Sequence, residues 1–104
     1  MLQSELEVIL HQHKLWVESN GKKGVCVNLV GANLSGADLP YANLCGANLK
    51  RVNLAGADLY GAHLHQADLV GANLKRVNLE RAYLEGAYLK GADLEGANLE
   101  RANL

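Results

Sequence analysis

Residues 27–49 read VNLVGANLSGADLPYANLCGANL, and a leucine stands at every fifth position of this stretch from Leu29 onward. The spacing continues without a slip to Leu104, so sixteen leucines share one period. Two places before each leucine stands Ala, or Val in three repeats, and directly before it stands Asn or Asp in thirteen repeats. Gly stands two places after the leucine in nine of the fifteen complete repeats. Any fold for this part of the chain must therefore explain a period of five.

A period of five suits neither of the two regular elements. An α-helix turns by about 100° per residue, so successive leucines would wind around all of its faces. In a β-strand the odd period would send them alternately to opposite faces. A chain that bends once per repeat in the same direction points every leucine, and the small residue two places before it, at one axis. Because Asn, Asp and Gly favour turns, we predict a solenoid.

The units ANLSG, ADLPY, ANLCG and ADLEG resemble the A(D/N)LXX units of the pentapeptide-repeat family, and the resemblance covers residues 27–104. It implies an all-β solenoid, namely a right-handed quadrilateral (four-sided) parallel β-helix with one repeat on each side and four repeats in each coil. The chain then has about four coils. The interior is expected to hold the central leucines: Leu29, Leu34, Leu39, Leu44, Leu49, Leu54, Leu59, Leu64, Leu69, Leu74, Leu79, Leu84, Leu89, Leu94 and Leu99.

Residues 1–24 lack the period of five, so we separate an N-terminal capping helix and turn from a repeat domain at residues 25–104. Apolar residues at helical intervals predict an α-helix over about residues 5–19. Ser4 and Glu7 have the spacing of a capping box. The Asn-Gly pair that follows the segment is typical of a helix end.

The apolar side chains of this segment predict how the helix is used. A solenoid needs its end covered, and we expect the helix to lie over the first coil near Val25, Val27 and Leu29. The alternative, a helix that binds a membrane surface or a partner, would favour a strongly basic polar face, whereas Glu5, Glu7, Lys14 and Glu18 are mixed in sign. The capping residues that we predict are Leu6, Ile9, Leu10 and Trp16.

The sequence ends within a repeat, at Leu104. We expect the last coil to present an open leucine interior and unpaired backbone groups, which invite a partner. The partner that we predict is a second copy, packed coil against coil about a two-fold axis. Tyr83 and Tyr88 replace the usual Asn or Asp near this end, and amphipathic aromatic residues suit an interface. The alternative is that both lie half-exposed on the flank.

The outward residues are the candidates for chemistry, because the inward ones fill the interior. With repeats four apart stacked, Cys45, His65 and Glu85 form one outward column, with His63 beside it. Cys45, His63 and His65 are therefore the candidates for a metal-responsive or redox-responsive module. Outward side chains on a flat wall do not converge as metal ligands must, and a filled rod offers no pocket for a nucleophile. We therefore predict no metal site, no cofactor and no catalytic residue, and hence no enzyme.

The charges bear on the family's best-known role. Some pentapeptide-repeat proteins resemble duplex DNA in outline and charge and bind DNA gyrase in its place, which requires a long, strongly negative rod. This chain has a net charge of -1, with eight acidic and seven basic side chains in residues 27–104. The sequence therefore favours a non-enzymatic structural or protein-interaction module with an unidentified protein partner over a DNA-mimicking modulator of topoisomerases. The near-neutral charge argues against nucleic-acid binding.

No run of apolar residues is long enough to span a membrane. The polar, acidic start of the chain lacks the basic and then apolar pattern of an export signal. We therefore expect no membrane contact and a cytoplasmic location.

Overall fold

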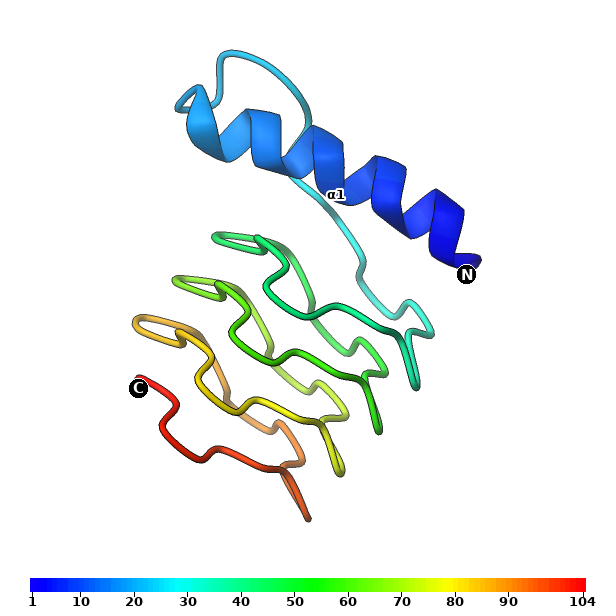
Figure 1. Ribbon diagram of the computed structural model, residues 1–104, viewed down its shortest axis with the longest axis vertical. Helices are drawn as coiled ribbons and strands as arrows, with labels where there is room; N and C mark the ends of the chain where they lie inside the picture. The colour runs from blue at the N-terminus through cyan, green and yellow to red at the C-terminus, as the bar shows by residue number, and fades with distance from the viewer.

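The computed structural model describes residues 1–104 as one α-helix followed by a coiled chain (Figure 1). Helix α1 spans Gln3–Glu18. From residue 27 onward the chain winds in stacked coils, and α1 lies across the first of them (Figure 1). The molecule measures 37 × 27 × 21 Å along its principal axes. No helix of the structure is both long and apolar enough to cross a membrane.

The coils stack in parallel with a register of 20 residues. Asn28 pairs with Asn48, Asn33 with Asn53, and the series continues to Tyr83 with Asn103. The pairing residue is always the one before a leucine, and four such positions occur in each coil, one on each of four sides. The observed architecture is therefore a four-sided parallel solenoid.

The sides of the solenoid contain no continuous strand, which refines the all-β expectation. Each side contributes a single bridging residue, because the chain bends again two residues after every leucine. The bonds between coils are nonetheless regular. Leu29 N–H donates to the Asn48 carbonyl at 2.8 Å, and Asn48 N–H donates back to the Val27 carbonyl at 3.1 Å. Isolated bridges with this pattern replace the strands of an ordinary sheet.

Each corner is a tight turn in which a backbone N–H bonds to a carbonyl three residues earlier, as Ala32 does to Leu29 at 3.0 Å. The third residue of this turn has a positive φ in all fifteen complete repeats. This is the pattern of a type II turn, which favours Gly at that position. Gly occupies nine of the fifteen positions, and the other six hold Tyr41, Arg51, Gln66, Arg76, Arg81 and Arg101.

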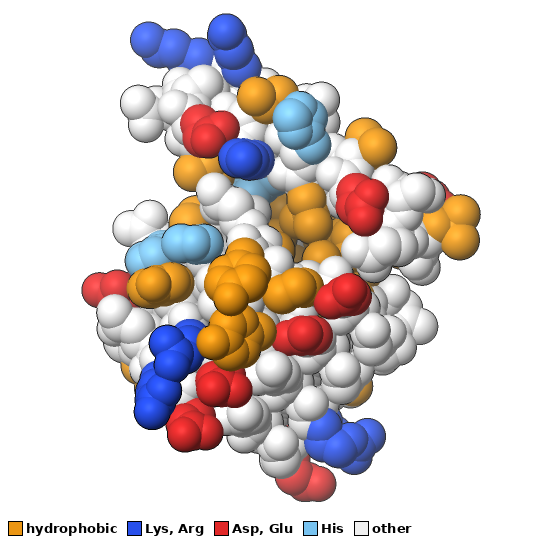
Figure 2. All heavy atoms as spheres, in the orientation of Figure 1, with side chains coloured by type: hydrophobic (Ala, Val, Ile, Leu, Met, Phe, Trp, Pro, Cys, Tyr) orange, Lys and Arg blue, Asp and Glu red, His pale blue; other side chains and the backbone are white.

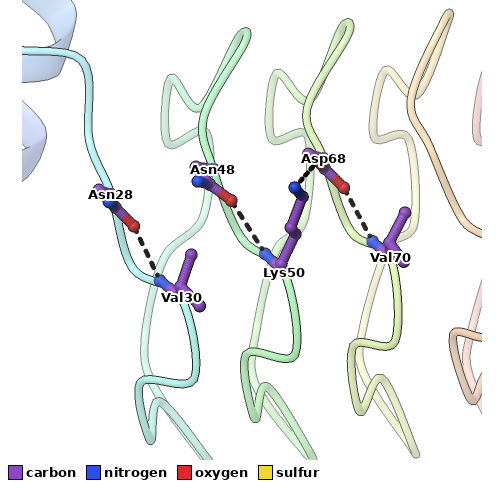
Figure 3. Close-up of polar contacts among 6 residues, drawn as sticks. All are labelled: Asn28, Val30, Asn48, Lys50, Asp68 and Val70. Carbon is purple, nitrogen blue, oxygen red and sulfur yellow. Dashed lines mark hydrogen bonds and ion pairs between the residues drawn. The ribbon is translucent and has the colours of Figure 1, made fainter.

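The polar residue before each leucine stabilises the turn that follows it. The side-chain oxygen of Asn28 accepts a hydrogen bond from the Val30 N–H at 3.2 Å, and Asp68 does the same for Val70 at 3.1 Å (Figure 3). Asn48 Oδ1 accepts in the same way from the N–H of Lys50, whose ammonium group lies 3.5 Å from Asp68 (Figure 3). Asn and Asp favour such local bonds, which explains their place in the repeat.

The interior consists of the leucines and of the Ala or Val two places before them. Leu49 and Leu59 have no exposed surface. In the last coil Leu89 is partly exposed, and Leu104 is 72% exposed. The buried leucines, each at most 5% exposed, are Leu29, Leu34, Leu39, Leu44, Leu49, Leu54, Leu59, Leu64, Leu69, Leu74, Leu79 and Leu84, whereas Leu89, Leu94 and Leu99 are partly buried against them.

The start of α1 differs from the predicted capping box. The helix begins at Gln3, two residues earlier than expected, and its N-cap is Leu2, which makes no side-chain capping bond. Ser4 already lies inside the first turn, so its hydroxyl cannot cap that end. The other end follows the expected signal. Asn20 has φ 56°, and the N–H groups of Asn20 and Gly21 bond to the carbonyls of Val17 and Trp16, which is a Schellman motif.

Leu6 and His13 are the buried residues of α1, and Ile9 and Leu10 pack against the leucine core. The His13 ring stacks on Trp16 at 5.6 Å. Val25, which was expected beneath the apolar face of the helix, is 63% exposed.

The position of Trp16 also differs from the expected one. Its ring lies about the turn at Gly46, where a Cβ would be 3.6 Å from the indole. Trp16 follows His13 by almost one helical turn, and it contacts the last turn of the first coil instead of lying near Val27 and Leu29.

His13 supplies two backbone bonding partners that the first coil lacks. Val27 N–H donates to His13 Nδ1 at 3.0 Å, so the neutral ring carries its hydrogen on Nε2, which donates to the Cys45 carbonyl at 2.8 Å. In the later coils, from Lys50 onward, the carbonyl equivalent to that of Cys45 receives a backbone N–H of the preceding coil, as His65 does from Gly46. The imidazole therefore stands in for part of a preceding coil.

Candidate functional site

One corner of the solenoid is hollowed into a groove of about 460 Å³. We name it the Tyr-Arg corner. One flank is the turn column at positions 41, 61, 81 and 101, which the register of 20 residues brings into line. The other flank comes from the bridging positions of the next side. The lining residues are Tyr41, Tyr60, Gly61, His63, Arg81, Tyr83, Arg101 and Asn103.

Tyr41 is held in place by the glycine below it. A Cβ on Gly61 would lie 2.7 Å from two carbons of the Tyr41 ring, so the ring occupies the space of the absent side chain. Tyr60 meets the same ring edge-to-face, with centroids 5.5 Å apart. Gly61 is buried although it lies in an outward turn, whereas Tyr41 is still 67% exposed. The corner thus presents an aromatic face in a fixed position.

The second flank of the Tyr-Arg corner is a stack of rings. His63 and Tyr83, which bridge as neighbours between coils, lie 4.9 Å apart and nearly parallel. His65 stacks on Tyr83 at 5.6 Å and lies 6.1 Å from His63. Tyr83 is 40% exposed, so this flank also offers ring surface to a ligand. Figure 2 shows a face of the solenoid on which hydrophobic, histidine and Lys or Arg side chains gather together.

The two arginines of the corner have no ion-pair partner. The ion pairs between Lys or Arg and acidic side chains join Lys50 to Asp68 at 3.5 Å and Lys75 to Asp93 at 3.6 Å, both on other walls. Arg81 and Arg101 are exposed, follow each other in one column and form no such pair. Their guanidinium groups are therefore free to bind an anion.

Cys45, His65 and Glu85 form a line of contacts on the adjoining wall. Cys45 Sγ lies 3.6 Å from His65 Nδ1, and His65 Nε2 lies 3.5 Å from a Glu85 oxygen. The Asn103 amide also donates to that oxygen at 3.1 Å. Burial raises the pKa of the Cys45 thiol, and hydrogen bonding lowers it only in part. The arrangement therefore holds a protonated thiol at neutral pH, which is a poor nucleophile.

A thiol, an imidazole and a carboxylate in one line do not make a metal site. No three His, Cys, Asp or Glu side chains of the structure are placed to hold a metal ion together. Of the sequence candidates, Cys45, His63 and His65 do lie side by side. Cys26 lies one coil above Gly46, with its sulfur 3.7 Å from that carbonyl, and both cysteines are free thiols.

The predicted interface residues do not form one surface. Tyr83 lies in the Tyr-Arg corner, on the flank, and stacks on histidines. Tyr88 is 61% exposed on a different side, where it bridges to Asp68. Leu104 lies at the exposed end of the last coil. The two tyrosines thus lie on adjacent sides of the solenoid.

Sequence reasoning missed the column that carries the corner. Tyr41, Arg81 and Arg101 all occupy the turn position that Gly normally fills. Writing the repeats in rows of 20 residues would have placed them in one line. Tyr60 and the ring position of Tyr41 over Gly61 depend on side-chain packing, for which the repeat pattern has no signal.

Fold and site together define a repeat protein of the β-solenoid class. The sequence pattern of pentapeptide repeats matches residues 28–66 and 67–104, in eight copies. The chain therefore belongs to the pentapeptide-repeat family, as its sequence predicted. Membership implies the right-handed quadrilateral form of the solenoid. Proteins of this family are generally non-enzymatic modules for protein interaction.

Several solved structures are similar to this chain. Rfr23, a pentapeptide repeat protein from the cyanobacterium Cyanothece 51142, is 35% identical over 73% of this chain and 56% of its own, with a TM-score of 0.43. A pentapeptide repeat protein from the Arabidopsis thaliana thylakoid lumen is 29% identical over 72% of this chain and 59% of its own, with a TM-score of 0.44.

HetL from Nostoc sp. strain PCC 7120, described as involved in the regulation of heterocyst differentiation, is 41% identical over 80% of this chain and 40% of its own, with a TM-score of 0.41. The chain thus spans between two fifths and three fifths of the length of these three relatives. No curated protein matches it.

Proposed function

We propose that this chain is a non-enzymatic protein-interaction module and that its partner docks on the Tyr-Arg corner. The observation that carries the proposal is the gathering of exposed tyrosine rings and unpaired arginines in one groove. Tyr and Arg are enriched among the residues that supply most of the binding energy at protein interfaces. On the other walls Lys50 and Lys75 are paired with aspartates, and the unpaired Arg51 and Arg76 stand singly in their columns, without exposed tyrosine rings in a shared groove.

The solenoid gives this surface the rigidity that a docking site needs. Tyr41 is fixed by Gly61 and Tyr60, and Tyr83 is fixed by His63 and His65. Rings that are already ordered lose little side-chain entropy on binding. Flat aromatic surfaces beside free guanidinium groups suit a partner segment that carries both apolar and acidic side chains.

Helix α1 serves in this proposal as the cap of the first coil. Its support is the burial of Leu6 and His13 and the packing of Ile9 and Leu10 against the leucine core. His13 in addition satisfies one backbone donor and one backbone acceptor of the coil edge. Capping of this kind stabilises the solenoid and leaves the walls free for a partner.

Affinity capture with matched variants tests the function. The immobilised 104-residue chain is compared with Arg81→Gly/Arg101→Gly and with Arg51→Gly/Arg76→Gly as the control pair. All four arginines occupy the same turn position, so both pairs change charge and backbone alike. We expect the wild-type chain and the control variant Arg51→Gly/Arg76→Gly to retain the same partner protein. The corner variant Arg81→Gly/Arg101→Gly should fail to retain it. Equal retention by both pairs would refute the corner as the docking surface.

A homodimer through the last coil is a separate proposal. Leu89, Leu94 and Leu99 are partly exposed there, and their backbone N–H groups bond to no carbonyl. Packing of the same coil of a second copy would cover these leucines about a two-fold axis. Light scattering is then expected to report about twice the chain mass of 11.2 kDa. A single-chain mass at high protein concentration would rule the dimer out.

A further inference from the structure

The Tyr-Arg corner concentrates strained turn residues on one column of the solenoid. A non-glycine residue with positive φ is held in a less favourable backbone conformation than the one it prefers. Six turns bear this strain, and three of them, at Tyr41, Arg81 and Arg101, lie in the corner column. Each of the other three columns has only one such residue. Strain that gathers at one place points to a function for the side chains it places there.

The arginine pair determines the charge of the ligand. Arg81 and Arg101 stand on adjacent coils, which are about 4.8 Å apart in a β-ladder. A guanidinium group presents a planar fork of donors that matches the oxygens of a phosphate, and two neighbouring forks suit the dianion of a phosphate monoester. Neither arginine is paired with a carboxylate within the chain. The corner therefore has two cationic groups that no carboxylate of the chain neutralises.

No acidic residue lines the groove. Glu80 and Glu100 precede the two arginines in sequence, but neither lines the groove and neither lies within ion-pair distance of Arg81 or Arg101. Acidic side chains are visible near the basic ones in Figure 2. They reduce the attraction for anions at long range, so the contact has to rely on direct hydrogen bonds rather than on the net field.

The tyrosine rings favour a ligand that carries a planar ring beside its anionic group. Tyr41 and Tyr83 expose ring surface on the two flanks of the groove. Planar ring systems, such as nucleobases, stack favourably on such surfaces. The groove is open at the surface of the solenoid, so a planar ring can reach the tyrosines from solvent while its phosphate meets the arginines.

We propose that the Tyr-Arg corner binds a phosphate monoester carried on a planar ring, with the phosphate on Arg81 and Arg101 and the ring on Tyr41 or Tyr83. A nucleoside monophosphate and a phosphotyrosine side chain share this chemistry. The ligand binds without any covalent change. The proposal concerns the same groove as the protein partner, but it requires no partner, because the purified chain alone should bind the ligand.

The test is a titration of the purified chain, followed by the ring NMR signals of tyrosine and histidine. The probes are adenosine monophosphate and O-phosphotyrosine, with adenosine and inorganic phosphate as the half-ligand controls. We expect one or both of the ring phosphates to shift the signals of Tyr41 or Tyr83. They should bind at least about tenfold more tightly than adenosine or inorganic phosphate alone. A tenfold ratio corresponds to a second contact of about 1.4 kcal/mol. The stronger of the two probes identifies the source of the ligand.

Two variant pairs make the result specific to the corner. Arg81→Gly/Arg101→Gly should weaken binding of the ring phosphate by about tenfold or more, whereas Arg51→Gly/Arg76→Gly should leave it unchanged. Glycine suits the positive φ of all four positions, so both pairs should fold, and the thermal midpoint verifies this. Equal weakening in both pairs, or inorganic phosphate binding as tightly as the ring phosphates, would overturn the proposal. So would the absence of any signal shift with either ring phosphate at millimolar concentration.

The titration and the capture experiment fail independently. If the ring phosphates bind but no protein is captured through the corner, the ligand site stands and the docking surface does not. If a protein is captured through the corner but neither ring phosphate binds, the proposal of a phosphate ligand is wrong and the docking surface stands. An acidic peptide without phosphate that binds more tightly than both probes would likewise overturn the phosphate ligand.

Discussion

His13 accepts a hydrogen bond from the Val27 N–H at 3.0 Å through Nδ1, which only a neutral imidazole can do. Its other nitrogen donates to the Cys45 carbonyl at 2.8 Å. A charged ring would carry hydrogens on both nitrogens, so the Val27 N–H would lose its acceptor. Burial accordingly lowers the pKa of His13 below its usual 6.5, and the bond to the Cys45 carbonyl opposes this only in part. The docking of α1 is thereby linked to pH.

Acidification is expected to destabilise the protein through His13. Because the folded-state pKa is lowered, the unfolded chain binds more protons between that pKa and 6.5. The contribution of the neutral ring is therefore fully present above pH 6.5 and is lost as the pH falls through 6.5 toward the folded-state pKa. Urea unfolding at about pH 7.5 and about pH 5.5 measures the loss. His13→Ala should lower the free energy of unfolding at the higher pH by about 1 to 3 kcal/mol and flatten the pH dependence.

His11 provides the control on the same helix, because its side chain is exposed. His11→Ala should change the free energy of unfolding by less than about 0.5 kcal/mol and keep the pH dependence. A pH dependence that survives in His13→Ala but disappears in His11→Ala would contradict the link to docking.

The interior should respond to the loss of one leucine side chain according to its depth. Leu59 has no exposed surface, so Leu59→Ala is expected to lower the free energy of unfolding by about 2 to 5 kcal/mol. Leu104 has the same place in its repeat but is 72% exposed, so Leu104→Ala should cost much less. Chemical unfolding of both variants measures the difference. Equal losses would mean that the leucines do not line a common interior.

The solenoid and its family could be predicted because a strict period of five leaves the chain one way to bury its leucines. The outward column of Cys45 and His65 also follows from that period once repeats four apart are stacked. The docking of His13 could not be predicted, since its partners are backbone groups that only the three-dimensional edge of the first coil brings together. The capping-box spacing of Ser4 was misleading, because the N-cap is Leu2, two residues before Ser4.

The corner was missed for a different reason. Its column is interrupted by Gly61, so the sequence suggests an ordinary turn between Tyr41 and Arg81. The ring of Tyr41 fills the space over that glycine and joins the column into one groove. A spacing rule places Cα positions, whereas this contact depends on the direction in which one side chain lies.

The Cys45 thiol is expected to react slowly at neutral pH. Burial raises its pKa, so less of the reactive thiolate is present than in an ordinary thiol at the same pH. The rate of alkylation by iodoacetamide should therefore rise at higher pH for Cys45 than for a thiol in the unfolded chain. The measurement uses Cys26→Ser, so that Cys45 is the only thiol. In the Cys26→Ser protein, His65→Ala removes the neighbouring imidazole. Fast alkylation of Cys45 at low pH that disappears with His65→Ala would contradict the expectation and indicate a thiolate stabilised by His65.

Gly61 and Gly56 form a matched pair that isolates the contact with Tyr41. Both glycines have nearly the same positive φ, 63° and 67°. A Cβ at Gly56 would meet nothing within 4 Å, whereas a Cβ at Gly61 would lie 2.7 Å from the Tyr41 ring. Gly56→Ala should thus show only the backbone strain of about 1 to 2 kcal/mol. Gly61→Ala should show that strain together with the displacement of the ring from the corner.

The displacement has its own signature in the free energy of unfolding and in the groove. Gly61→Ala should be the more destabilised of the two glycine variants by thermal unfolding, and the NMR signals of Tyr41 and Tyr60 should shift in it but not in Gly56→Ala. In a protein that also carries Tyr41→Ala the ring is absent. Gly61→Ala should then lower the free energy of unfolding by no more than Gly56→Ala does. If the excess cost of Gly61→Ala persists without the ring, the glycine is required for the turn itself, and Tyr41 does not owe its place in the corner to it.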